Sequence, residues 1–236
     1  LDYIRYPFQN SRTQFGYEAV GKQRFRDETG QSIGKKGDHV LKTWIAWKTS
    51  PVTSFVKEVS DLLDSHDKTL QLSAAVFPMS RTSRLLAIQQ DWETWVQNGW
   101  VDTLSPMIYT SSRSKFEATL GGIARKTENK AFVYPGIAIF RLDPQEILGH
   151  LEAVRRTGGM GSTLFAMAHL DEPKMYALQY GPYKEKPSIS PHRKPFKALV
   201  TLINNYRTKF NHLQYLGELS TSSRRVIAEI QTDLSD

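Results

Sequence analysis

Residues 70–77 have the sequence LQLSAAVF, the first of four apolar runs rich in β-forming residues. The other three are DTLSPMIY at 102–109, AFVYPGIAIF at 131–140 and STLFAMAHL at 162–170. The starts of the four runs are separated by 32, 29 and 31 residues. Each run is continuously apolar and does not alternate strictly with polar residues. This pattern predicts strands that are buried on both faces, as in a parallel sheet.

Helical periodicity precedes the first run and lies between the runs. Apolar side chains recur at helix spacing in four segments, 52–63, 92–96, 116–123 and 147–154. Asp143 followed by Pro144 predicts an N-cap and the first residue of the last of these helices. Strand and helix therefore alternate as repeated βα units. Such units form either an open doubly wound sheet or a closed eight-stranded barrel, and periodicity alone does not distinguish the two.

The two ends of the chain differ from this regular centre. The opening LDYIRYP at 1–7 predicts the end of a further strand, and residues 8–42 are predicted to form a long polar loop. We expect a partial βα barrel over 1–182, a Pro-rich connector over 183–195, and a C-terminal helix and tail over 196–236 that packs on the barrel or follows it. A closed barrel takes roughly 250 residues for eight units, so we expect this chain to supply the second half of one.

Composition excludes several classes of protein. The chain has no cysteine, which excludes disulfide scaffolds, Cys-ligated metals and thiol catalysis. Its six histidines show no HxH or HExxH spacing, so we expect no metal site, and nothing indicates a cofactor. The net charge of +7 is spread along the chain, so we expect no nucleic-acid partner. No apolar stretch approaches the roughly 18 residues of a transmembrane helix.

Candidate site residues follow from the ends of the predicted strands, because parallel β/α folds bind ligands at the carboxyl ends of their strands. After the first strand end, this rule selects Asp2, Tyr3, Arg5 and Tyr6; after the 70–77 run it selects Phe77 and Arg81; later it selects Met107, Tyr109 and His169. Aromatic side chains at such positions can stack on sugar rings. For His169, the alternative is a structural histidine with satisfied hydrogen bonds.

Two carboxylates are candidates for acid–base chemistry. Asp2 lies at a strand end beside Tyr3 and Arg5, and the alternative is a structural role, paired with Arg5 or capping the loop. Asp91 lies at the start of the helix after the 70–77 strand, on the same rim as the strand ends. The alternative for Asp91 is an ordinary acidic residue that complements the helix dipole.

Several motifs follow one another in a recognisable order. They are LDYIRYP at 1–7, FGY at 15–17, the tryptophans Trp44 and Trp47, LSAAVFP at 72–78, QQDWETW at 89–95 and SPMIYT at 105–110. Together they resemble the glycosyl-hydrolase-10-like family, a domain of bacterial and cyanobacterial envelope proteins. The stretch MAHLDEPKMYALQYGPY at 167–183 resembles its cyanobacterial branch.

The resemblance implies a fold and a location. It implies an α/β fold of the (β/α)8 TIM-barrel type, present here as about strands four to eight, with a C-terminal helical extension. It also implies an exported protein, in the periplasm, in the cell envelope or secreted.

The resemblance further implies a glycoside hydrolase that cleaves O-glycosidic bonds of an envelope or extracellular polysaccharide without a cofactor. Asp2 matches the acidic position after strand four and Asp91 an acidic position after strand five. Tyr3 and Arg5 are expected to orient Asp2 or to hold a sugar hydroxyl, and Met107 and Tyr109 to line the cleft.

Two alternatives to hydrolysis remain open. We find no Glu at the predicted strand ends, where barrel glycosidases often carry one, so a non-catalytic glycan-binding barrel is the first alternative. The second is an open α/β domain that binds a phosphorylated ligand. That domain would need a Gly-rich turn directly after a strand, which the sequence lacks.

Overall fold

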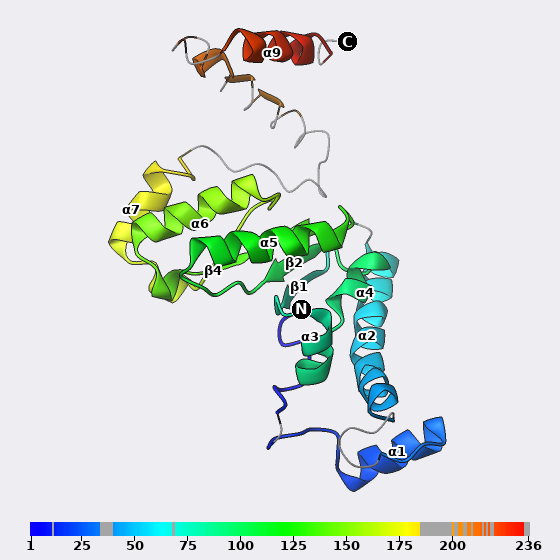
Figure 1. Cartoon of the computed structure of the whole chain (residues 1–236). Helices are drawn as coiled ribbons and strands as arrows, with labels where there is room; N and C mark the ends of the chain where they lie inside the picture. The colour runs from blue at the N-terminus through cyan, green and yellow to red at the C-terminus, as the bar shows by residue number, and fades with distance from the viewer. Residues whose placement is uncertain are drawn as a thin grey trace. The chain divides into compact units, whose positions relative to one another are not determined.

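A computed structural model describes residues 1–10, 12–33, 40–67 and 69–184, and in the C-terminal part residues 200, 203–204, 207–208, 210–213, 215, 217 and 220–233. The chain divides into two compact units, Leu1–Lys184 and Glu185–Asp236. The second unit contains helix α9 (Thr221–Asp233) (Figure 1). Most of the predicted connector, and part of the predicted C-terminal helix, lie outside the described residues. The predicted domain boundaries therefore stay a prediction.

The first unit is built on short parallel strands. They are β1 (Ser73–Val76), β2 (Thr103–Pro106), β3 (Phe132–Val133), β4 (Gly136–Ala138) and β5 (Thr163–Phe165). β1 pairs with β2, β2 with β3 and β4 with β5, and a parallel bridge from Met107 to Gly136 joins β2 to β4. Leu1 extends this order beyond β1, since the backbone N–H of Ala75 donates to the Leu1 carbonyl at 2.9 Å. All four predicted apolar runs therefore form strands, and spatial order follows chain order.

The helices of the first unit pack in chain order as well. They are α1 (Ala19–Thr29), α2 (Val40–His66), α3 (Arg81–Ile88), α4 (Trp92–Gln97), α5 (Arg113–Thr127), α6 (Pro144–Arg156) and α7 (Glu172–Tyr180), with 3-10 turns at Ile139–Arg141 and Met167–His169. The four predicted helical segments lie within α2, α4, α5 and α6. The predicted start of α6 is confirmed: Asp143 forms a capping box with Glu146, and Pro144 is the first helical residue.

These helices cover one face of the sheet. α2 packs on α3 and α4, α4 on α5, α5 on α6 and α6 on α7. Figure 1 shows α5 and α6 side by side over the strands. A doubly wound sheet would carry helices on both faces. Sequential parallel strands with helices on one side are instead typical of β/α barrels.

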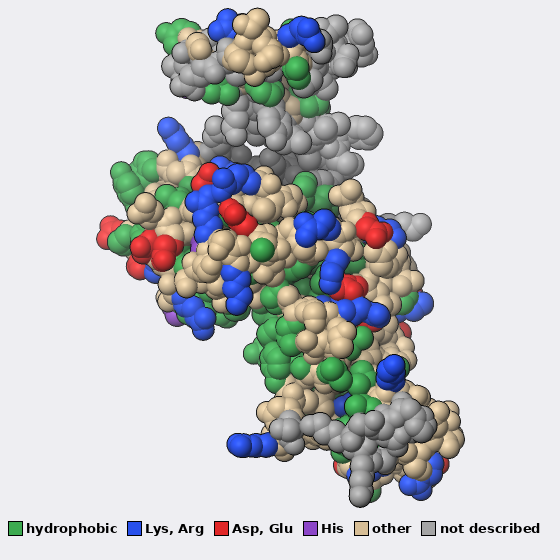
Figure 2. All heavy atoms as spheres, in the orientation of Figure 1, with side chains coloured by type: hydrophobic (Ala, Val, Ile, Leu, Met, Phe, Trp, Pro, Cys, Tyr) green, Lys and Arg blue, Asp and Glu red, His purple; other side chains and the backbone are tan. Residues whose placement is uncertain are grey.

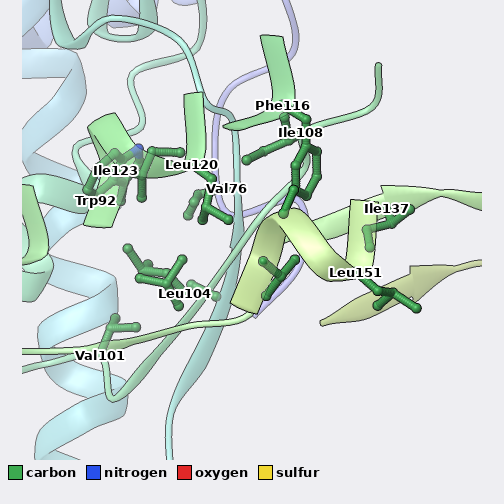
Figure 3. Packing of buried hydrophobic residues seen from close by; sticks show 14 of the residues in the cluster. Val76, Trp92, Val101, Leu104, Ile108, Phe116, Leu120, Ile123, Ile137 and Leu151 are labelled. Carbon is green, nitrogen blue, oxygen red and sulfur yellow. The ribbon is translucent and has the colours of Figure 1, made fainter. Parts of the chain in front are cut away.

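The prediction that the strands are buried on both faces is wrong for β1, β2 and β5, in which more buried and more exposed residues alternate. It agrees with β4, whose three residues are all buried. In β1, the side chains of Ala74 and Val76 face the helices and are only 1% and 0% exposed. Ser73 and Ala75 point to the opposite face and line the pocket. Leu104 of β2 is likewise fully buried, among the side chains shown in Figure 3. The second face lacks a covering layer of described helices. The runs look continuously apolar because residues on this open face, such as Ala75 and Met107, are also apolar.

The polar loop predicted over 8–42 is also wrong in part, because it contains α1 and the start of α2. Phe25 is the large apolar side chain that α1 buries, so the helix leaves no apolar period in the sequence. The Phe25 ring packs edge-on against Trp44 and Trp47 of α2, with centroids 5.0 and 5.6 Å away. Tertiary aromatic contacts therefore hold a helix that local periodicity does not reveal.

The surface carries mixed charge. Figure 2 shows basic and acidic side chains interspersed over α5 and α6. Ion pairs account for part of this mixing, including Arg113 with Glu152 at 2.9 Å and Arg156 with Glu117 at 3.0 Å. No helix in the described ranges combines the length and the apolar character that crossing a membrane requires.

Leu104 tests the helix-covered face of the sheet. Because its side chain is 0% exposed, we expect Leu104→Ala to lower the free energy of unfolding by about 2–5 kcal/mol, through lost burial and the cavity left behind. Urea denaturation followed by tryptophan fluorescence measures this loss. Leu86→Ala is the matched control, since Leu86 is 48% exposed on α3, and we expect a change of no more than about 0.5 kcal/mol. Equal losses in both variants would contradict this assignment of the core.

Candidate functional site

A pocket of about 560 Å³ opens on the uncovered face of the sheet. Its walls come from the N-terminal segment and from β1, β2, β4 and β5, with the residues that follow them. The lining residues are Leu1, Asp2, Tyr3, Arg5, Ser73, Ala75, Phe77, Ser105, Met107, Tyr109, Gly136, Thr163 and Phe165. The pocket has the size of a small-molecule site and reaches the carboxyl ends of the strands, where β/α barrels bind ligands.

The lining follows the period of a β-strand. Residues 73, 75 and 77 line the pocket from one strand, residues 105, 107 and 109 from the next, and residues 163 and 165 from the last. Alternate residues of a strand point to one face, so these positions share the face that the helices leave open. Gly136 allows the close approach of the neighbouring strand, since a Cβ there would lie 3.1 Å from Cε1 of Tyr109.

Asp2 is the single acidic side chain among the described residues that line the pocket. Its Oδ1 accepts a hydrogen bond from the backbone N–H of Tyr3 at 2.8 Å. Burial raises the pKa of Tyr109, and the negative charge of Asp2 raises it further. The Tyr109 hydroxyl therefore stays protonated at neutral pH and can donate a hydrogen bond into the pocket.

The backbone around Asp2 is constrained. Tyr3 has a φ of 55°, in the left-handed region that bulky residues rarely adopt, and its side chain is 75% exposed. On one side of this turn, Leu1 pairs with β1. On the other side, the N–H of Tyr6 donates to the carbonyl of Ile88 at 2.9 Å. These anchors fix the direction in which Asp2 and Tyr3 enter the pocket.

Three aromatic side chains gather on the β4–β5 side of the pocket, and we call them the aromatic shelf: Tyr109, Phe140 and Phe165. Tyr109 stacks on Phe165 with ring centroids 5.4 Å apart, and Phe140 lies edge-on to both, at 6.2 and 6.3 Å. Phe140 and Phe165 are 38% and 48% exposed. Exposed aromatic faces of this kind suit a flat ligand with apolar surfaces, such as a sugar ring. His169 lies at the outer edge of the shelf, its ring 5.6 Å from that of Phe140, and does not line the pocket.

Asp91 and Arg81 do not line the pocket either. They pair with each other, with Arg81 Nε and Nη2 donating to the two Asp91 carboxylate oxygens at 2.9 and 2.7 Å. Thr94 donates a third hydrogen bond to the same carboxylate at 2.8 Å. Burial alone would raise the pKa of Asp91, but the hydrogen bonds from Arg81 and Thr94, with the charges of Arg81 and Arg84, outweigh it and lower the pKa. This environment suits a permanently ionised structural carboxylate.

The segment that follows the pocket residues is held by a buried lysine on α2. Lys48 is 2% exposed, and its Nζ donates to Gln9 Oε1 at 2.9 Å and to the Phe15 carbonyl at 3.2 Å. The ammonium also lies 5.6 Å from the ring centroid of Tyr6, which therefore packs toward α2 and not into the pocket. Burial lowers the pKa of Lys48 to about 8, although the charge of Glu18 acts in the opposite direction.

Most of the predicted site residues thus meet in one place. The structure brings Asp2, Tyr3, Arg5, Phe77, Met107 and Tyr109 to the pocket and leaves Tyr6, Arg81, Asp91 and His169 outside it. Sequence reasoning missed the other lining residues, which are Leu1, Ser73, Ala75, Ser105, Gly136, Thr163 and Phe165. It also missed Phe140, which belongs to the aromatic shelf but does not line the pocket. The hydroxyls of Ser105 and Thr163 lie 3.4 Å apart. A period of two within each apolar run is the signal that could have found the inward ones. The described residues contain no cluster of three His, Asp or Glu side chains that could hold a metal ion.

The parallel strands, the helices on one side and the pocket at the strand ends define a β/α protein of the barrel type. Residues 2–139 match the family model described as glycosyl hydrolase-like 10, and the chain therefore belongs to this family. The match spans more than half of the 236 residues. No curated protein matches the sequence.

One solved structure supports the same architecture. The chain is similar to the catalytic domain of β-amylase from Paenibacillus polymyxa, with a TM-score of 0.53 and 14% sequence identity. The similarity covers 78% of this chain and 61% of the β-amylase chain. At this identity the likeness shows the fold alone, and the chain spans about three-fifths of the length of that structure.

Lys48 makes the stability of this region depend on pH. Its folded pKa of about 8 lies below the value near 10.5 of a free lysine, so the unfolded chain binds more protons between these two pH values. We expect the free energy of unfolding of the wild type, relative to Lys48→Met, to rise by about 1 kcal/mol from pH 8 to pH 9 and to stay constant from pH 6 to pH 7. Urea denaturation at each pH measures the difference. Lys57→Met is the control, since it removes an exposed lysine of the same helix. The free energy of unfolding of the wild type relative to Lys57→Met should not rise from pH 8 to pH 9.

Asp91 can be tested as a structural residue by stability alone. We expect Asp91→Asn to lower the free energy of unfolding by about 1–3 kcal/mol, because the buried side chain loses a bidentate, charge-assisted contact with Arg81. Asp61→Asn is the control, since Asp61 forms an exposed i,i+4 pair with Lys57 and its loss should cost no more than about 0.5 kcal/mol. An Asp91→Asn protein as stable as the wild type would argue against the structural role.

Proposed function

We propose that this protein binds a polysaccharide in the pocket at the strand ends and hydrolyses its O-glycosidic bonds, with Asp2 as one of the reacting carboxylates. The observation that carries the proposal is the position of Asp2, which lines the pocket together with Tyr109 and Phe165 of the aromatic shelf. Membership of the glycosyl hydrolase-like 10 family supports the reaction class. The shelf would hold a sugar ring, and the protonated Tyr109 would donate a hydrogen bond to a sugar oxygen beside the reacting bond.

Hydrolysis of this kind uses two carboxyl groups. One protonates the leaving oxygen, and the other acts as a nucleophile at a separation of about 5–5.5 Å or as a base for water at about 6.5–9.5 Å. Asp91 is a poor candidate for the second group, because Arg81 and Thr94 hold its carboxylate outside the pocket. We therefore place the second carboxylate outside the described residues that line the pocket.

A specific observation favours a second candidate function, a glycan-binding barrel without hydrolysis. Asp2 has no acidic neighbour among the described lining residues, and binding needs no pair of carboxylates. The aromatic shelf would serve binding equally well. The two functions differ in one property, the release of new sugar ends.

The location and the substrate belong to the same proposal. We propose that the protein works outside the cytoplasm on a polysaccharide of the cell envelope or the surrounding medium, as the family resemblance implies.

Reducing-end release from a panel of envelope polysaccharides tests the proposal, with the full-length product of the gene as the enzyme. We expect release by the wild type and its loss, by a factor of at least about 10², in Asp2→Asn, because an amide can neither donate the proton nor act as a nucleophile. Glycan binding, measured by calorimetry on the same samples, should persist in the variant.

The other outcomes of the assay separate the two functions. Binding by both forms without release from any glycan would replace hydrolysis with the binding function. Release that Asp2→Asn leaves intact would keep the enzyme and remove Asp2 from the chemistry. Asp171→Asn is a matched control, because Asp171 is an exposed helix cap outside the pocket.

A further inference from the structure

Arg5 is the single basic side chain among the described residues that line the pocket. Three aromatic rings surround its guanidinium. The Cζ atom lies 4.7 Å from the ring centroid of Tyr3 and 5.1 Å from those of Phe8 and Phe77. Phe8 and Phe77 in turn pack edge-to-face on each other at 4.9 Å. The aromatic neighbours fix the position of the cation without neutralising its charge.

Most of the N–H donors of Arg5 have no hydrogen-bond partner among the described residues. One nitrogen, Nη1, donates to the Tyr6 carbonyl at 3.0 Å. Within the described ranges no carboxylate lies within ion-pair distance of Arg5, whereas Arg81, Arg84 and Arg113 each have an acidic partner. The alternative in which Asp2 pairs with Arg5 is not found among these contacts, since the Asp2 carboxylate accepts a hydrogen bond from the backbone N–H of Tyr3.

A guanidinium in this state is suited to a particular ligand group. It presents a planar fork of N–H donors that matches a carboxylate with two parallel hydrogen bonds. Its aromatic surroundings remove part of its hydration, which strengthens a charged contact when a ligand arrives. A neutral sugar hydroxyl would use one of these donors and leave the charge uncompensated.

From these contacts we propose that the pocket selects a glycan that carries a carboxylate, and that Arg5 binds this carboxylate. The inference rests on the proposed function, because it names the substrate class of the same pocket. The carboxylate belongs either to the sugar ring, as in a uronic acid, or to a short acidic ether substituent on a sugar hydroxyl. Both sources present the same planar anion to Arg5.

The opposite charges of Asp2 and Arg5 would also orient a bound acidic sugar. Asp2 repels a carboxylate and Arg5 attracts one, so an acidic sugar binds with its anion toward Arg5 and away from Asp2. The remaining ring faces can then contact aromatic side chains. An acidic sugar would therefore bind in one orientation, with its carboxylate at Arg5.

Matched pairs of glycans test the proposal by calorimetry on the full-length protein. One arm compares an oligouronate with the same oligosaccharide after reduction of its carboxyl groups to alcohols. The other compares carboxymethyl-dextran with dextran. We expect the wild type to bind the acidic member of at least one pair more tightly, and the arm that shows the preference identifies the source of the carboxylate.

Arg5→Gln should weaken binding of that acidic glycan about ten- to hundredfold, the size expected for a lost charged hydrogen-bonded contact, and leave binding of the neutral member unchanged. Arg12→Gln removes an exposed arginine with the same net charge change and should bind like the wild type. The neutral member serves as the folding control, because a variant that had merely lost its structure would lose both glycans alike.

Three results would overturn the inference: equal binding of the two members of each pair by the wild type, equal loss of both in Arg5→Gln, or the same loss in Arg12→Gln. If one of these three results is obtained while the wild type still binds a glycan, or cleaves one in a reaction that depends on Asp2, the proposed function stands and the role of Arg5 fails. If the wild type binds no glycan of either kind, the proposed function fails with it.

Discussion

Burial of one face of the parallel sheet is the constraint on which the first unit depends. Ala74, Val76 and Leu104 point from the strands into helices that follow one another in chain order, and the same helices leave the other face uncovered. The strands follow one another in one direction, and βα crossovers are right-handed, so every helix returns to the same side of the sheet as the previous one. The open face and its pocket are therefore a direct consequence of where the hydrophobic core lies, and the site needs no scaffold of its own.

The N-terminal segment supplies the chemistry that the strands lack. The strands contribute mainly small or apolar inward side chains, whereas the pocket's acid and cation, Asp2 and Arg5, both come from residues 1–5. This segment is anchored at Leu1 by the edge of β1 and further along by contacts to Ile88 and to Lys48. A short tethered segment can present charged side chains at an apolar pocket while its backbone remains hydrogen-bonded, so that no unpaired backbone group is buried.

The sequence predicts the elements better than it predicts their faces. Runs of apolar residues and the capping signal at Asp143 locate strands and helices, because both depend on local pattern. The sequence does not predict helix α1, because Phe25 is held by aromatic contacts with Trp44 and Trp47 of another helix. The uncovered face is not predicted either: Ala75 and Phe165 are apolar like core residues, so the strand period assigns them to one face but only the position of the helices shows that this face is open. For Asp91 the error is in the other direction: the sequence predicts a site residue, but the structure shows it paired with Arg81 outside the pocket.

Among the described residues, the pocket lining holds one carboxylate and one guanidinium without an ion-pair partner, which differs from a lining with two carboxylates. Paired acids act on the glycosidic bond itself and are indifferent to the substituents of the sugar. A guanidinium held by Tyr3, Phe8 and Phe77 acts on a substituent and leaves the bond untouched. Under the proposed function, the described lining would bind and orient a sugar, and cleavage would need a second carboxylate in addition to Asp2. A single acid can cleave such a bond only when a second reacting group lies within reach of it, and the orientation that we propose Arg5 gives to the sugar would determine where that group has to be.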